Sequence, residues 1–100
     1  MTDRIRNASL AVGTTGVIIA PQLFEGQRSV LVITNTSTAG QIITLQTGEQ
    51  AQAGGAGIIL YPAGSWSESI DSAFMPSNLE YWAVASAAAG TIAIQERIKI

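Results

Sequence analysis

The stretch GIILYPAGSWSESI, residues 57–70, changes character halfway along. Residues 57–61 are apolar without a break, and Pro62-Ala63-Gly64 then gives way to strict alternation. Alternation is typical of a strand with one face in the core and the other in solvent. An unbroken apolar run instead indicates a strand that is covered on both faces. The stretch therefore predicts two strands of different surroundings, joined by a turn.

The alternating half predicts the direction of each side chain. Three serines share one face and are expected to meet solvent, whereas Trp66 and Ile70 point to the core. Glu68 lies on the Trp66 face, so we expect it at the rim of the sheet or beside a cation such as Arg28 or Arg97. The apolar half needs the opposite sheet on one face and a loop, an arm or a neighbouring subunit on the other.

Similar short runs recur along the whole chain, and no segment shows sustained apolar spacing of a helix. Turn residues such as Gly, Pro, Ser and Asn separate the runs. The expected strands span residues 5–12, 15–20, 28–35, 41–47, 57–61, 65–71, 81–87 and 91–98. About eight short strands predict an all-β fold, an antiparallel β-sandwich or jelly-roll-like barrel. The link GEQAQAGGAG, residues 48–57, is too long for a tight hairpin, and we expect it to cross between the sheets.

The composition is poor in charge. Of 100 residues, 47% are hydrophobic and 12% are charged, with a net charge of −2; an average domain has about 25% charged residues. Such a surface is typical of a neutral virion or secreted protein, or of one buried against copies of itself. The five cations are scattered, so the basic footprint of a nucleic-acid-binding protein is missing.

The residue types exclude most catalytic chemistry. The chain has no histidine and no cysteine, so the common catalytic dyads, thiolate metal sites and disulfides are unavailable. Glu68 with Asp71 or Glu80 is the only concentration of acids, and a solvated rim explains it better than glycoside hydrolysis. We expect no enzyme activity, no catalytic residues, no cofactor and no metal. Apolar runs are too short to span a bilayer, and no signal-peptide core is visible, so we expect no membrane partner.

Four aromatic residues are candidate contacts with a partner. Tyr61, Trp66, Tyr81 and Trp82 offer either a sugar-stacking platform or anchors for the core and interfaces. Tyr81 and Trp82 are adjacent and must point to opposite faces of one strand. We expect one of the two in the core and the other outward or against a partner.

Three segments together resemble a known class of protein. GQRSVLVITNTSTAGQIITLQTGEQA, GAGIILYPAGSWSES and YWAVASAAAGTIAIQE are similar to small accessory proteins of tailed phages, namely capsid decoration (cement) or head-fibre proteins with β-sandwich domains. The resemblance covers about residues 13–98. It implies a non-enzymatic virion structural protein on the capsid surface, made in the host cytoplasm. It also implies a homo-oligomer, with a trimer favoured, whose partner is the major capsid protein.

Two hypotheses about binding follow. Residues 1–12 are expected to form an N-terminal arm or strand that grips the capsid, ahead of one domain over residues 13–100. Arg4, Ile5, Arg6 and Leu10 would make its contacts, and Tyr61, Trp66 and Trp82 are the aromatic partner-contacting candidates. The alternative is a carbohydrate- or receptor-binding module of a tail or fibre. It expects Trp66 or Trp82 to be exposed on a flat face that takes a surface glycan.

Overall fold

The computed structural model describes residues 3–52, 55–71 and 75–100, and it confirms an all-β chain. No helix in these residues could cross a membrane. The strands follow the sequence expectation to within a few residues. They are β1 (Asp3–Val12), β2 (Val17–Ala20), β3 (Gln27–Asn35), β4 (Ile43–Thr47), β5 (Ile58–Leu60), β6 (Ser65–Ser69), β7 (Tyr81–Ala85) and β8 (Gly90–Lys99).

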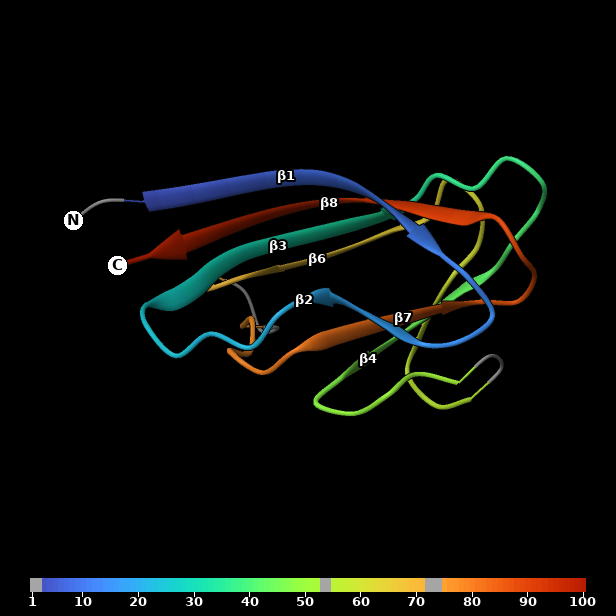
Figure 1. Ribbon diagram of the computed structural model, residues 1–100. Coiled ribbons are helices and arrows are strands. Elements are labelled where there is room, and N and C mark those ends of the chain that lie inside the picture. The colour runs from blue at the N-terminus through green and yellow to red at the C-terminus, as the bar shows by residue number, and fades with distance from the viewer. Residues whose placement is uncertain (1–2, 53–54, 72–74) are drawn as a thin grey trace.

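The strands form two antiparallel sheets that face each other (Figure 1). Sheet A has the order β1-β8-β3-β6, and sheet B has the order β2-β7-β4-β5. Each sheet therefore combines strands from both halves of the chain, which is the double Greek key of a jelly roll. The molecule is elongated along the strands, with extents of 41 × 23 × 22 Å.

The core lies between the sheets and is built by alternation. In β8, Ile92, Ile94, Glu96 and Ile98 are buried, whereas the residues that alternate with them are partly or fully exposed. Leu31 and Ile33 of β3 face Ile43 and Leu45 of β4 within the same cluster. Period-2 burial in both sheets is what a two-layer sandwich requires.

The two halves of residues 57–70 belong to different sheets. β5 pairs with β4 at the edge of sheet B, and β6 pairs with β3 at the edge of sheet A. Ser65 and Ser67 are exposed, and Trp66 packs against the core, as the alternation predicts. The turn between them is tight, because Ala63 adopts a positive φ of 67°.

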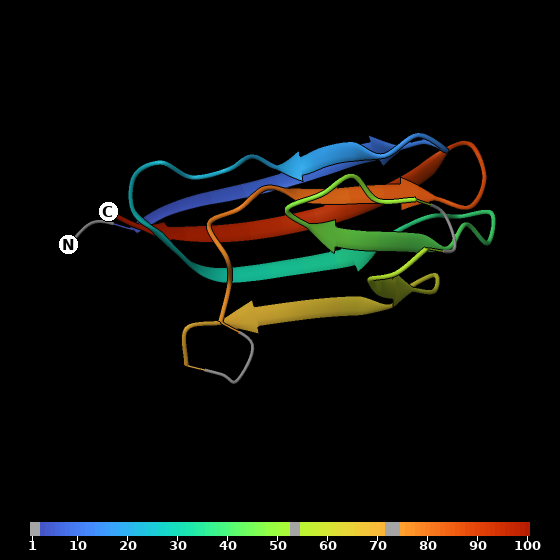
Figure 2. The ribbon, with the colours of Figure 1, turned by 90° about the horizontal axis from the view of Figure 1, so that it is seen from below.

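The link over residues 48–57 was expected to cross between the sheets, and this expectation is wrong. β4 and β5 are antiparallel neighbours in sheet B, so the link is a long hairpin connection. Its described residues, 48–52 and 55–57, lie over the outer face of sheet B (Figure 2), where Ala51 is buried and its backbone lies against Gly16. This cover is partial, because Ile18 of β2 is 50% exposed and Ile59 of β5 is 41% exposed. The expectation that the apolar run over residues 57–61 is covered on both faces is therefore wrong for the single chain.

Residues 3–12 are part of the sandwich and do not form a separate arm. β1 pairs with β8 over its whole length, from Asp3 opposite Lys99 to Val12 opposite Gly90. Val12 belongs to the core, and Ala8 and Leu10 pack against it. The expected boundary after residue 12 therefore cuts through sheet A.

Candidate functional site

Charge is unevenly distributed along the sandwich. Eleven of the twelve charged residues belong to the half that holds Asp3 of β1, Lys99 of β8 and the start of β3. The twelfth, Glu49, lies in the link that folds back over sheet B, next to Gln50, whose Nε2 donates to the Gly16 carbonyl. The charged residues are Asp3, Arg4, Arg6, Glu25, Arg28, Glu49, Glu68, Asp71, Glu80, Glu96, Arg97 and Lys99. We call the half with Asp3 and Lys99 the charged end.

The opposite end carries no charge at all. It consists of four connections, residues 13–16, 36–42, 61–64 and 86–89, which we call the uncharged end. Most of their side chains are small and exposed, and Tyr61 is the largest, with 65% of its surface accessible. Such a surface lacks the charges that oppose burial in a protein–protein interface.

Asn35 holds two of these connections in place. Its side chain is fully buried, and its Nδ2 donates to the carbonyl oxygens of Gln41 at 2.8 Å and Leu60 at 2.9 Å. Its Oδ1 accepts a 3.0 Å hydrogen bond from the Ser37 amide. The Asn35 backbone also bonds to Ala63 and Gly64. A buried, satisfied amide of this kind fixes the loop geometry.

The other two connections are tied in as well. The amide of Ala85 donates to the carbonyl of Gly13, and Gln41 Nε2 donates to the carbonyl of Ala88 at 2.9 Å. Ala63 and Ala89, both at this end, have positive φ angles of 67° and 66°. Non-glycine residues adopt this conformation at a cost, and such strain clusters at functional sites. The uncharged end is therefore a pre-organised surface.

The charged end is organised around Arg28. Its guanidinium is completely buried and donates from Nε to Glu96 Oε2 at 2.6 Å. It also donates to the backbone carbonyls of Pro21, Ser77 and Leu79. Arg28 thus ties two loops to the buried carboxylate, and its role is structural.

Glu68 lies on β6, the edge strand of sheet A, in agreement with the expected place at the rim. It does not pair with Arg28, one of the two cations that the sequence offered as an alternative. Its Oε1 accepts a 2.6 Å hydrogen bond from the hydroxyl of Tyr81, which lies across the core in sheet B. Burial of Tyr81, followed by this hydrogen bond, raises its pKa to about 12. Arg28 lies over the Tyr81 ring, 5.0 Å from its centroid. Glu68 therefore joins the two sheets through Tyr81.

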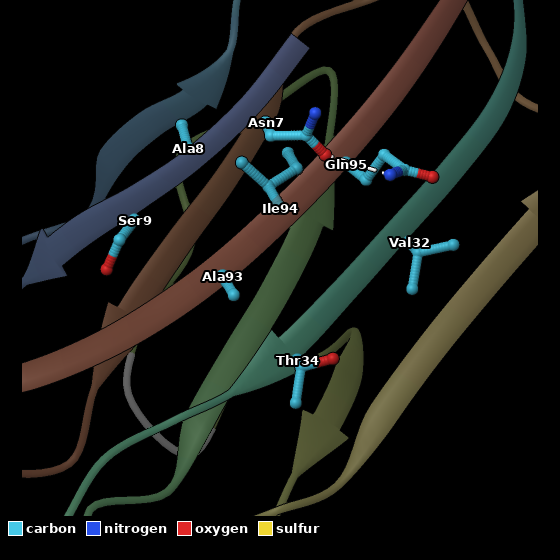
Figure 3. A pocket seen from close by; sticks show the side chains of 8 residues that line it. All are labelled: Asn7, Ala8, Ser9, Val32, Thr34, Ala93, Ile94 and Gln95. Carbon is cyan, nitrogen blue, oxygen red and sulfur yellow. Dashed lines mark hydrogen bonds between the residues drawn. The ribbon is translucent and has the colours of Figure 1, made fainter. Parts of the chain in front are cut away.

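The outer face of sheet A is the second candidate surface. No described segment covers it (Figure 1), in contrast to sheet B. A shallow hollow of about 420 Å³ lies on it (Figure 3), lined by small or neutral side chains of β1, β8 and β3. Gln95 Nε2 donates to Asn7 Oδ1 at 2.8 Å beside this hollow. The lining contains no aromatic ring for sugar stacking.

The predicted partner-contacting residues divide into two groups. Arg4, Ile5 and Tyr61 are exposed and available to a partner, with Ile5 51% accessible. Arg6 instead donates to Glu96 at 2.8 Å and to the Ile19 carbonyl. Leu10 is half-buried against the core. The seven residues thus do not form one site.

The tryptophans do not form a flat exposed platform. Trp66 packs against the core, and the indole nitrogens of both Trp66 and Trp82 are buried. Tyr81 is buried between the sheets, so its neighbour Trp82 faces the other side of β7, as the alternation predicts. Of the four aromatic candidates, Tyr61 alone has an exposed ring.

Sequence reasoning missed Asn35 and Glu96. For Glu96 a signal existed, because it shares the period-2 face of Ile92, Ile94 and Ile98 and must enter the core. Asn35 is the last residue of the strand expected over residues 28–35, and no pattern in the sequence indicates a further role for it. Its buried role depends on loops that are distant in sequence.

Comparison with known proteins gives a fold relationship only. The chain matches no family model, and no curated protein is significantly similar to it in sequence. A protein of the Bacillus endospore appendages, described as disulfide-linked pili, superposes with a TM-score of 0.61. It is 13% identical, and the match covers 99% of this chain and 88% of that one. At this identity the likeness shows the shared β-sandwich fold.

Two further solved structures are more distant. The Aeromonas hydrophila PliG, a periplasmic inhibitor of g-type lysozyme, gives a TM-score of 0.41 at 13% identity and covers 97% of this chain and 84% of that one. PirA gives 0.41 at 15% identity, with 100% and 96% covered. These scores are too low to support an inference about function.

Proposed function

We propose that this chain is a non-enzymatic structural subunit that docks onto a larger assembly through its uncharged end. The assembly implied by the sequence resemblance is a phage capsid, which the chain would decorate and stabilise. The observation that carries the proposal is the segregation of eleven of the twelve charged residues to the opposite half. Charged residues scattered evenly over the surface would be enough to keep the chain soluble. Their segregation to one half therefore indicates that the other half has a different role.

The physical argument concerns the free energy of docking. Burying a charged side chain without a partner is costly, and interface cores are depleted in charge and enriched in tyrosine. The uncharged end combines this composition with loops that hydrogen bonds already hold in place. A pre-organised surface loses little conformational entropy on binding. The charged end would then face solvent and keep the assembly soluble.

Stabilisation of a shell follows by mass action. A subunit that binds the assembled shell but not its separated parts raises the free energy of rupture by RT ln(1 + [L]/Kd). The gain is about 2.7 kcal/mol per site when the free subunit exceeds Kd a hundredfold. Repetition over a lattice makes the total resistance to internal pressure large.

The test is the copy number of the chain in purified virions. Quantitative mass spectrometry would compare it with the major capsid protein. A ratio that matches the sites of the capsid lattice supports decoration. A handful of copies per particle points to a tail or fibre, and absence from particles overturns the proposal.

A carbohydrate- or receptor-binding module is the second candidate. The hollow on sheet A, with neutral hydrogen-bonding groups from Asn7 and Gln95, favours it. Titration with a broad glycan panel tests it, with Asn7→Ala and Gln95→Ala as variants and Thr47→Ala as the control. Binding that both variants weaken supports this function, and the absence of any binding removes it.

A further inference from the structure

The edges of the two sheets differ in length and regularity. β5 has three residues, β6 has five, and β2 has four residues with a register shift. β1, in contrast, has ten residues and pairs with β8 without a single register shift. Its other edge pairs with no strand of the described chain. One long, regular row of backbone donors and acceptors is thus left open.

Over residues 7–12, β1 lacks the features that protect a natural edge strand. Such edges usually carry proline, lysine, a bulge or a covering loop. β1 has no proline or lysine and no bulge. The charged residues of β1 lie within its first four positions, residues 3–6, and Arg6 is already paired with Glu96. Residues 7–12 present an uncharged edge that is open to strand addition.

Apolar side chains beside this edge are also incompletely covered. Leu10 and Ala8 pack on the core from β1 but remain partly exposed. On the adjacent strand of sheet B, Val17 is 37% exposed and Ile18 is 50% exposed. A strand added along β1 would place further side chains over this side of the sandwich.

We propose that a second copy of this chain docks here, with β1 pairing antiparallel to β1 of the second copy about a two-fold axis. The two copies of sheet A then form one continuous antiparallel sheet. An isologous pair satisfies both long edges at once and closes. Pairing β1 with β6 of another copy would match a ten-residue edge to a five-residue one and would not close.

The charges select the register. A two-fold axis perpendicular to the sheet keeps the same face of both copies on the same side. Odd positions of one β1 therefore lie opposite odd positions of the other, and even positions lie opposite even positions. An axis at Arg6 would set Arg6 against Arg6, and one at Ile5 would set Arg4 against Arg6; like charges directly opposite are destabilising. An axis at Asn7 avoids both and pairs residues 3–11 with residues 11–3.

The Asn7 axis also brings Arg4 of one copy opposite Leu10 of the other. The aliphatic part of Arg4, which is exposed, can then cover the half-buried Leu10. A shift by one further position would set Arg4 against Val12, which is already buried. The register centred on Asn7 is therefore the one we propose.

Because the chain has no cysteine, single cysteines can report this geometry in the intact protein. Spin labels on Asn7→Cys should be close neighbours. Labels on Ser9→Cys and Ala11→Cys should be separated by about 14 Å and about 27 Å along the strands, since each residue advances about 3.4 Å. All three positions are exposed.

Analytical ultracentrifugation gives the complementary measurement. The wild type should sediment at twice its 10.4 kDa mass, and Asn7→Lys, which sets like charges opposite each other, should raise the dissociation constant at least tenfold. Ser67→Lys on the opposite edge of sheet A is the control and should leave it unchanged. A monomeric wild type, or label distances that do not increase from position 7 to 11, would overturn the proposal. The antiparallel pair points the two uncharged ends in opposite directions, so one end of each pair faces the larger assembly and the other faces away. Overturning the pair would leave docking of a single copy through its uncharged end unaffected.

Discussion

Arg28 and Glu96 form an ion pair, 2.6 Å from Nε to Oε2, in which both side chains are buried. The pair lies on neighbouring strands of sheet A and reaches the loops through three backbone carbonyls. Glu96 also accepts from Arg6 at the margin of the core. The buried charged side chains of this charge-poor protein thus lie where the strands of sheet A meet the loops, and they hold the two together.

Replacement of Arg28 by Met should lower the free energy of unfolding by about 3–5 kcal/mol. It leaves Glu96 in the core without its closer partner and three carbonyls without a donor. Arg6→Met is the matched control, because Arg6 is 37% exposed, and should cost about 1 kcal/mol. Urea unfolding followed by circular dichroism measures both. Equal losses for the two variants would contradict a dominant role for Arg28.

The raised pKa of Tyr81 predicts a loss of stability in alkali. The hydroxyl has a pKa of about 12 in the folded chain, against 10.0 ordinarily. Folding therefore favours the neutral form, and this contribution is complete below pH 10 and is lost as the pH rises towards 12. Unfolding curves from pH 8 to 11.5 should show the decline. Tyr81→Phe should flatten the decline above pH 10, and an unchanged profile in that variant would assign the effect elsewhere.

Close packing at the start of β8 predicts that Gly90 does not tolerate a side chain. A Cβ on Gly90 would lie 2.8 Å from Ala85 Cβ and 2.8 Å from the Val12 carbonyl oxygen. Gly90→Ala should therefore destabilise the fold by about 1–3 kcal/mol through overpacking. Gly13 has nothing within 4 Å of its Cβ position, so Gly13→Ala should be close to neutral. Thermal unfolding compares the two, and a similar melting temperature for both variants would show that the strands can move apart.

Much of the fold could be predicted from the sequence because alternation and turn chemistry are local. The serine face of β6, the opposite directions of Tyr81 and Trp82, and the eight-strand sandwich all follow from period-2 patterns. The link over residues 48–57 was placed wrongly because length alone does not distinguish a crossover from a folded-back hairpin connection. The link lies over sheet B through contacts with Gly16, which is distant from it in sequence.

The candidate surface could not be predicted because it is a property of topology. Charged residues are spread from position 3 to position 99 in the sequence, and only the antiparallel order of the strands brings all of them except Glu49 to one end. The same order gathers four separate uncharged connections at the other end. Asn35 was expected only as the last residue of a strand, and its three side-chain hydrogen-bond partners come from the connection over residues 36–42 and from the end of β5.

The most direct test of docking through the uncharged end compares two matched threonine variants. Thr38 lies at the uncharged end and Thr47 at the charged end, and both are exposed. Purified capsids would be incubated with wild type, Thr38→Glu and Thr47→Glu, and bound copies counted by quantitative mass spectrometry. Docking through the uncharged end predicts that Thr38→Glu lowers occupancy at least tenfold while Thr47→Glu binds like the wild type. Equal occupancy for all three chains, or a loss confined to Thr47→Glu, would contradict it.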